Sequence, residues 1–145
     1  MTGITNPTEE YFKDGLWGWD GTRWQKAGLP LWYRTSYFED LGGTATSTSW
    51  SKYSTVVPTG YVYVVSAVSL RNETQASGCT EFLLYNDAGL YVHLAWAASL
   101  VQNQPLVWSG SVVLSAGCYI RVIMGTIQSG DGIFGGLAGY KVAIA

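Results

Sequence analysis

The chain has 145 residues, a mass of 15.8 kDa and a formal charge of -2, which fits one domain with one hydrophobic core. Its eight basic residues are scattered, which argues against a nucleic-acid groove, and no apolar run of about 18 residues exists to span a membrane. Charged residues make up 12% of the chain, about half of the usual roughly 25%, so we expect either that uncharged side chains meet the water or that part of the surface is covered by partners.

The chain starts with a segment that has neither a helical nor a strand period. Residues 1–14 include a proline and adjacent acids, and we expect them to form an extended arm ahead of a single domain over residues 15–145. Tyr11 and Phe12 are the large apolar side chains of the arm. Residues 1–7 are polar and do not resemble a secretion signal.

A tryptophan-rich β-hairpin is predicted over residues 16–26, because an Asp-Gly pair between alternating residues favours a two-residue turn. With this turn Trp19 faces Thr22. Trp17 then faces Trp24, and the three tryptophans share one side of the ribbon. We expect these large aromatic side chains to be buried, either against the rest of the same chain or against another subunit. A third possibility is that they form a platform on which a sugar ring stacks.

The remaining sequence is a succession of short strand-like runs separated by turn residues. The segment 31–38, which contains Trp32, is β-prone, and the loop 42–49 after it is expected to be mobile or to face solvent. Further strands are predicted at residues 54–57, 61–70, 80–85, 91–96, 106–114, 119–127 and 140–144, with a glycine-rich loop over 129–139. No connection is long enough for a parallel crossover, so the fold class is all-β, an antiparallel β-sandwich or jelly roll.

Alternation assigns faces to some of these strands. Leu90, Val92, Leu94 and Trp96 are predicted to face the core. Cys118 is predicted to be buried on the side of Ile120. We read it and Cys79 as two reduced, buried thiols, although the spacing leaves a disulfide open. The segment 61–70 is apolar on both faces, as in a central strand covered by a second sheet or another subunit.

No catalytic constellation emerges from the sequence. The single histidine, His93, is predicted to lie on the outer face of a strand, and no Ser, Cys or Asp stands at a recognisable offset from it. Residues 130–135 match the letters of the dinucleotide motif GxGxxG, but no helix is predicted to follow them. We therefore predict no enzyme, no cofactor and no metal site, and a carboxylate-based enzyme stays open only through acids brought together from distant strands.

Two segments resemble parts of tailed-phage capsid decoration proteins, also called auxiliary or cement proteins, especially those of phages of thermophilic bacteria. Residues 16–24 are similar to the aromatic-flanked "DGTxW" hairpins of phage structural proteins. Residues 57–65 together with 108–122 resemble the jelly-roll strand pairs of such proteins. In those jelly rolls an acidic residue often follows the turn glycine, whereas this chain has Cys118 there.

The resemblance implies a homotrimer that binds the major capsid protein on the outer surface of a phage capsid and stabilises it. Such a protein is made in the host cytoplasm and resides in the virion, with no nucleic-acid or membrane partner. The side chains expected to make the contacts lie on the arm and the aromatic hairpin region: Tyr11, Phe12, Trp17, Trp19, Trp24 and Trp32. The alternative is a receptor-binding or sugar-binding tip of a tail fibre, but the sequence contains no shaft repeat.

Overall fold

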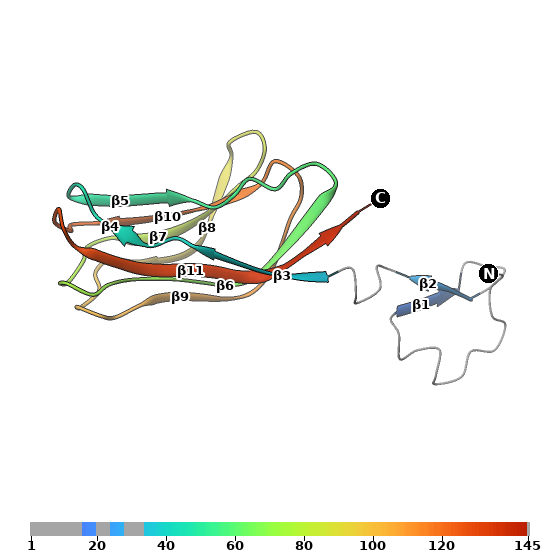
Figure 1. The fold of residues 1–145 in the computed structure, drawn as a ribbon, viewed down its shortest axis with the longest axis horizontal. Helices are drawn as coiled ribbons and strands as arrows, with labels where there is room; N and C mark the ends of the chain where they lie inside the picture. The colour runs from blue at the N-terminus through green and yellow to red at the C-terminus, as the bar shows by residue number, and fades with distance from the viewer. Residues whose placement is uncertain (1–15, 20–23, 28–33, 145) are drawn as a thin grey trace. The chain divides into compact units, whose positions relative to one another are not determined.

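The computed structural model describes residues 16–19, 24–27 and 34–144. Every regular element in these ranges is a β-strand (Figure 1), which confirms the predicted all-β class. Within the same ranges there is no helix that is long and apolar enough to cross a membrane.

The chain separates into two compact units, Met1–Thr35 and Ser36–Ala145, and each is described by itself. The predicted domain of residues 15–145 spans both units and stays a prediction. The predicted arm, residues 1–14, lies outside the described residues.

In the first unit, β1 (Leu16–Trp19) and β2 (Trp24–Ala27) form the predicted antiparallel hairpin. The register differs from the prediction, because Trp19 pairs with Trp24 and Trp17 pairs with Lys26. Four residues therefore connect the strands in place of two, a connection length that hairpins also use. The predicted pairing of Trp17 with Trp24 is wrong.

The second unit is a sandwich of two antiparallel sheets. Its strands are β3 (Arg34–Asp40), β4 (Gly43–Thr44), β5 (Ser49–Tyr53), β6 (Tyr61–Asn72), β7 (Thr80–Tyr85), β8 (Tyr91–Ala97), β9 (Leu106–Leu114), β10 (Tyr119–Gly125) and β11 (Gly132–Ala143). One sheet has the order β5-β10-β7-β8, and the other has the order β3-β11-β6-β9 with the short β4 added beside β11. Counting the eight longer strands along the chain, the sheets read 2-7-4-5 and 1-8-3-6, which is the strand order of a jelly roll.

The hydrophobic core fills the space between the two sheets. On β10 the alternation is regular, because Ile120, Val122 and Met124 are fully buried, and Cys118 on the same side is half-buried. On β6 the inward residues Val65, Val68 and Leu70 are equally buried. The predicted core side of β10 and the central position of β6 are confirmed.

The glycine-rich segment 129–139 was expected to be a loop, but most of it belongs to β11, an interior strand between β3 and β6. A Cβ atom on Gly139 would overlap the carbonyl oxygen of Val64 on β6, and one on Gly135 would overlap that of Ser69. Here glycine allows close approach of neighbouring strands instead of ending a strand. The loop prediction is therefore wrong for residues 132–139.

The segment around β5 also differs from the prediction. The strand is Ser49–Tyr53 and not residues 54–57, because serines at alternate positions hide its period from a reading based on apolar residues. The preceding loop is partly buried, since Ala45 is 2% exposed and its backbone N–H donates to the carbonyl oxygen of Asp131 at 2.9 Å. The other residues of the segment 42–49, apart from Gly42, are exposed, so the prediction that this segment faces solvent holds except at Gly42 and Ala45.

The predicted core side of β8 is wrong for three of its four residues. Leu90, Val92 and Trp96 are exposed, and Leu94 packs partly buried against the core. β8 is an edge strand, and a bulge opposite Phe82 changes the alternation partway along it.

Candidate interaction surface

Four tyrosines, one from each strand of the four-stranded sheet, form a row across its outer face. This tyrosine row consists of Tyr53 on β5, Tyr119 on β10, Tyr85 on β7 and Tyr91 on β8. The register builds it, because Tyr119 lies opposite Tyr85, and Tyr85 lies opposite Tyr91. Tyr53 lies opposite Arg121, two residues along β10 from Tyr119.

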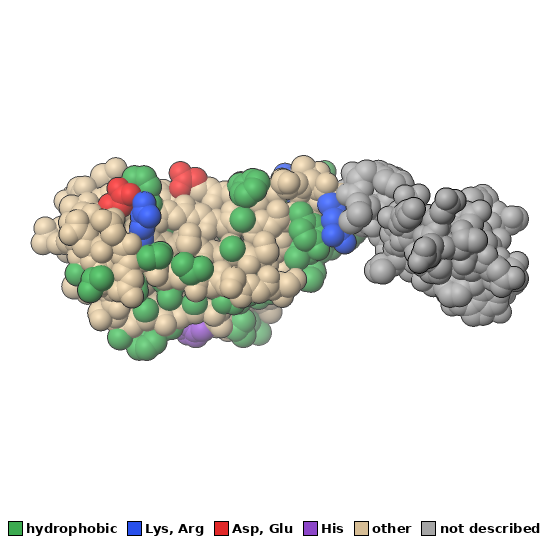
Figure 2. Space-filling view, turned by 90° about the horizontal axis from the view of Figure 1, so that it is seen from below, with side chains coloured by type: hydrophobic (Ala, Val, Ile, Leu, Met, Phe, Trp, Pro, Cys, Tyr) green, Lys and Arg blue, Asp and Glu red, His purple; other side chains and the backbone are tan. Residues whose placement is uncertain are grey.

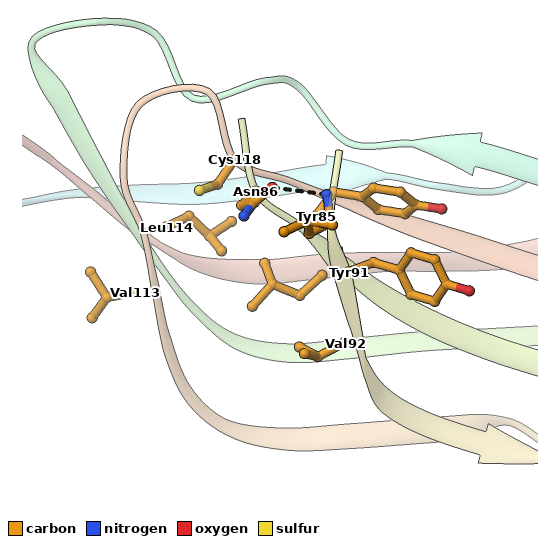
Figure 3. Close-up of a pocket in the computed structure, with 9 residues that line it drawn as sticks. Tyr85, Asn86, Tyr91, Val92, Val113, Leu114 and Cys118 are labelled. Carbon is orange, nitrogen blue, oxygen red and sulfur yellow. Dashed lines mark hydrogen bonds between the residues drawn. The ribbon is translucent and has the colours of Figure 1, made fainter. Parts of the chain in front are cut away.

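The rings of the row contact one another in sequence. Those of Tyr85 and Tyr119 are stacked, with centroids 4.9 Å apart and planes inclined by 6°. The centroid of Tyr91 lies 5.2 Å from that of Tyr85, and Tyr53 meets Tyr119 edge-on at 5.7 Å. Figure 3 shows the rings of Tyr85 and Tyr91 pointing the same way, and Tyr53 and Tyr91 at the ends of the row are 53% and 55% exposed. The stacked rings therefore present mainly their edges and hydroxyl groups to a partner.

Arg121 places a fixed positive charge within the row. Its guanidinium carbon lies 5.1 Å from the ring centroid of Tyr53, and its Nε donates to Ser51 Oγ at 2.9 Å. Its Nη1 also donates to the Tyr85 hydroxyl at 3.5 Å, and this contact raises the pKa of Arg121 above its ordinary value. The side chain is thus held by three neighbours in one orientation.

Beyond Tyr91 the same face carries polar and aromatic side chains of β7 and β8. His93 Nδ1 lies 3.4 Å from Glu81 Oε2, and its ring meets Tyr91 edge-on at 5.9 Å. Trp96 is 59% exposed, and its indole N–H donates to Cys79 Sγ at 3.0 Å. His93 lies on the outer face of its strand, as predicted.

The side chains of this face are of the types that bind partners. Among the described residues, no hydrogen bond joins the imidazole of His93 to a serine or cysteine. The same part of the chain contains no cluster of three or more His, Cys, Asp or Glu able to hold a metal ion. Cys79 and Cys118 are not paired with each other, as predicted, but Cys79 is exposed, so the prediction that both thiols are buried is wrong for it. Rigid tyrosines around an arginine are the residue types that carry protein–protein interfaces.

The outer face of the other sheet is flatter and carries few charges. Figure 2 shows it as backbone and small side chains with scattered hydrophobic ones. Phe134 is half exposed beneath the guanidinium of Arg71, whose carbon lies 5.8 Å from the ring centroid. A shallow groove of about 280 Å³ beside them also includes Pro105 and Val107.

The predicted contact residues all belong to the first unit, Met1–Thr35. Tyr11, Phe12 and Trp32 are not among the described residues, and Trp17 and Trp19 lie in β1 and Trp24 in β2, for which the strand pairing is described. Their role at an interface stays a prediction.

The tyrosine row itself was missed by sequence reasoning, although part of its signal was present. Tyr85 and Tyr91 flank the Asn-Asp-Ala-Gly turn symmetrically, so a hairpin there places them opposite each other. Nothing in the sequence indicated that Tyr119 would pair with Tyr85 from the other side, because that contact depends on the strand order of the sheet.

A comparison of the sequence with known protein families finds no match, and a comparison with curated proteins finds none. Among solved structures, the chain is similar to the VP2 protein of infectious bursal disease virus. For a point mutant of VP2 the identity is 11% and the TM-score is 0.46, and the match covers 98% of this chain and 37% of VP2. For the Gx strain the identity is 10% and the TM-score 0.43, with 97% and 38% covered.

A second kind of similar structure is the core of the Drosophila protein NLP, described for its pentamer formation and histone binding. The identity is 12% and the TM-score is 0.34, with 74% of this chain and 98% of the NLP core covered. The similar structures thus include viral capsid proteins, of which this chain spans less than two fifths. At such identities and TM-scores, the function has to be argued from surface chemistry.

Proposed function

We propose that this protein is a structural virion protein, a capsid decoration protein that binds the outer surface of a tailed-phage capsid as a homotrimer and stabilises it. The observation that carries the proposal is the tyrosine row with Arg121 at its centre. It provides a rigid aromatic surface on a sheet face that nothing in the described unit covers.

The geometry of the row favours a protein partner. Large aromatic side chains and arginine supply most of the binding energy at protein interfaces. Because Tyr85, Tyr91 and Tyr119 contact one another, they are ordered before binding, so little side-chain entropy is lost on docking. A surface built in this way suits the major capsid protein, which presents the same site many times.

A sugar-binding fibre tip is the alternative, and the exposed ring of Trp96 is the feature that favours it. Stacking on a pyranose needs a free ring face. The faces between Tyr85 and Tyr119 are occupied by each other, and Arg121 lies over the ring of Tyr53. The row therefore offers a sugar fewer free faces than its tyrosine content implies.

The first prediction tests the row directly. Tyr85→Ala and Tyr91→Ala, each made in the full chain, should weaken binding to expanded, DNA-free tailed-phage capsids at least about tenfold, because each removes an aromatic contact of the row, Tyr85 from its middle and Tyr91 from its exposed end. Binding is measured by cosedimentation over a range of protein concentrations, using a panel of capsids stripped of their own decoration proteins.

Tyr61→Ala is the matched control, because Tyr61 is 40% exposed and lies on β6 in the other sheet. Its binding should equal that of the unchanged protein. Full affinity of both row variants would remove the row from the proposal. Binding to a glycan array without binding to any capsid would replace the proposal with the fibre-tip alternative.

A further inference from the structure

One continuous part of the sequence has no charged side chain. No Lys, Arg, Asp or Glu occurs in residues 88–120, although the whole chain has 8 basic and 10 acidic residues. This segment contains β8 and β9, which are edge strands of the two sheets and contact each other on one side of the sandwich. We call the free edges of β8 and β9, together with the exposed Leu90, Val92 and Val113, the open side; Tyr91 belongs to the tyrosine row and is not counted in it.

The edge strands on the opposite side are protected by charge. β3 includes Arg34, Glu39 and Asp40, and β5 includes Lys52. Charged side chains on an edge strand prevent unwanted pairing of its free backbone groups with another chain. β8 and β9 have no such protection, since His93 is their one titratable side chain apart from Tyr91.

The open side also exposes large aliphatic side chains. Leu90 is 70% exposed, Val92 is 58% exposed and Val113 on β9 is 63% exposed. They line a pocket of about 190 Å³ between the ends of β8 and β9, together with Leu114 and Cys118 (Figure 3). When two copies meet, the protruding apolar side chains of one copy can enter the apolar recess of the other.

We infer that the open side is the surface through which copies of this chain associate. Where the contact lies along the symmetry axis of a homotrimer, equivalent side chains of the copies come close together, so charged side chains there would repel one another. An uncharged surface avoids this repulsion and has no charge with which to select a different partner. Association would cover Leu90, Val92 and Val113 and supply cover for the free edges of β8 and β9.

The inference deepens the homotrimer of the proposed function by assigning its contact surface, so it rests on that proposal. The second prediction is that Val113→Lys and Val92→Lys, each made in the full chain, raise the dissociation constant of the oligomer at least about tenfold. Both positions are more than half exposed, so a lysine fits the folded monomer. Mass is measured by analytical ultracentrifugation over a concentration series, and circular dichroism checks the fold.

Val56→Lys is the matched control, because Val56 is 51% exposed and lies outside the open side. It should leave the oligomer unchanged. If both lysine variants leave the dissociation constant of the oligomer unchanged, as Val56→Lys should, the inference is overturned. That result would say nothing against capsid binding. A monomeric unchanged protein would overturn the inference and the homotrimer together, while capsid binding would still be tested by the tyrosine variants.

Cys118 gives an independent readout of the same surface. In a Cys79→Ser background, its half-buried thiol should react with a maleimide at least about tenfold more slowly in the oligomer than in the Val113→Lys monomer. Equal reaction rates in the two would show that association leaves the pocket uncovered, and would overturn the inference.

Discussion

Asp131 is a buried carboxylate that is held entirely by neutral donors. It is 3% exposed, and its Oδ2 accepts hydrogen bonds from the Gln128 backbone N–H at 2.9 Å, from Asn72 Nδ2 at 2.8 Å and from Gln75 Nε2 at 2.7 Å. The bond from Gln128 contributes most to lowering the pKa of Asp131, and the two amides add to it, while burial acts in the opposite direction. The carboxylate ties the loop before β11 to the end of β6.

The third prediction concerns this carboxylate. Asp131→Asn should lower the melting temperature at pH 7 by several degrees, because a neutral amide oxygen accepts hydrogen bonds more weakly than a carboxylate and the amide brings an NH₂ group toward existing donors. Thermal unfolding followed by circular dichroism measures the change. Asp87→Asn, at an exposed position, is the control and should be neutral.

The same variant should change the pH dependence of stability. A lowered pKa in the folded state means that the carboxylate stabilises the fold above the unfolded pKa of about 3.9, and that this contribution is lost as the pH falls through the lower folded pKa. Urea unfolding should therefore show a smaller loss of unfolding free energy between pH 7 and pH 3 in Asp131→Asn than in the unchanged protein. Equal losses would contradict the assignment.

This network could not be predicted from the sequence. Asp131 lies within the accidental GxGxxG match, and its partner Asn72 is 59 positions away. Only the pairing of β11 with β6 brings the two side chains together. Asn72 itself lies beyond the predicted end of the strand 61–70.

At the scale of elements, the sequence predicted the strands whose apolar residues alternate and whose ends are marked by turn residues. It did not predict the strand in which glycines replace those apolar residues. The bounds of β7 and β9 match their predictions at both ends, because turn residues flank each strand. β11 was mostly missed, since its glycines remove the hydrophobic period. Val92 and Trp96 on β8 are exposed although they are predicted to face the core. Alternation shows which residues share a face of a strand, but it does not show whether another part of the protein covers that face.

The fourth prediction tests the role of glycine in β11. Gly139→Ala should destabilise the protein by about 1–3 kcal/mol, because the added methyl group would overlap the backbone of Val64 and push β6 and β11 apart. Urea unfolding at constant pH measures the difference. Gly125→Ala in β10 is the control, because its Cβ would meet the Cys79 carbonyl oxygen at an ordinary 3.5 Å, and it should change stability much less.

At the scale of the whole molecule, the two compact units allow the predicted arm to be tested apart from the sandwich. Residues 36–145 form a unit with its own core, so the fifth prediction is that deleting residues 2–12 leaves a folded oligomer with the same number of subunits. We expect this oligomer to lose capsid binding, because Tyr11 and Phe12 would no longer anchor it. Cosedimentation with expanded capsids measures the loss, and undiminished binding would show that the arm is not needed.

The sequence was sufficient to predict the jelly roll as a class, but not the surfaces that it displays. Apolar content, turn spacing and short connections all indicated two antiparallel sheets. The tyrosine row and the open side both depend on which strands become neighbours or edges, and local patterns do not contain that information. The sequence shows that residues 88–120 contain no charged side chain. Only the strand order shows that this segment contains an edge strand of each sheet.

The strand order also has a consequence for the way the chain folds. β10 lies between β5 and β7, and β11 lies between β3 and β6, so each sheet has an interior strand from the last part of the sequence. Neither sheet can close on the ribosome before those strands have been synthesised. Such long-range pairing slows folding to the millisecond-to-second range typical of β-sandwiches. Shortening the chain from its carboxyl end would therefore remove part of β11, an interior strand, and not an edge strand.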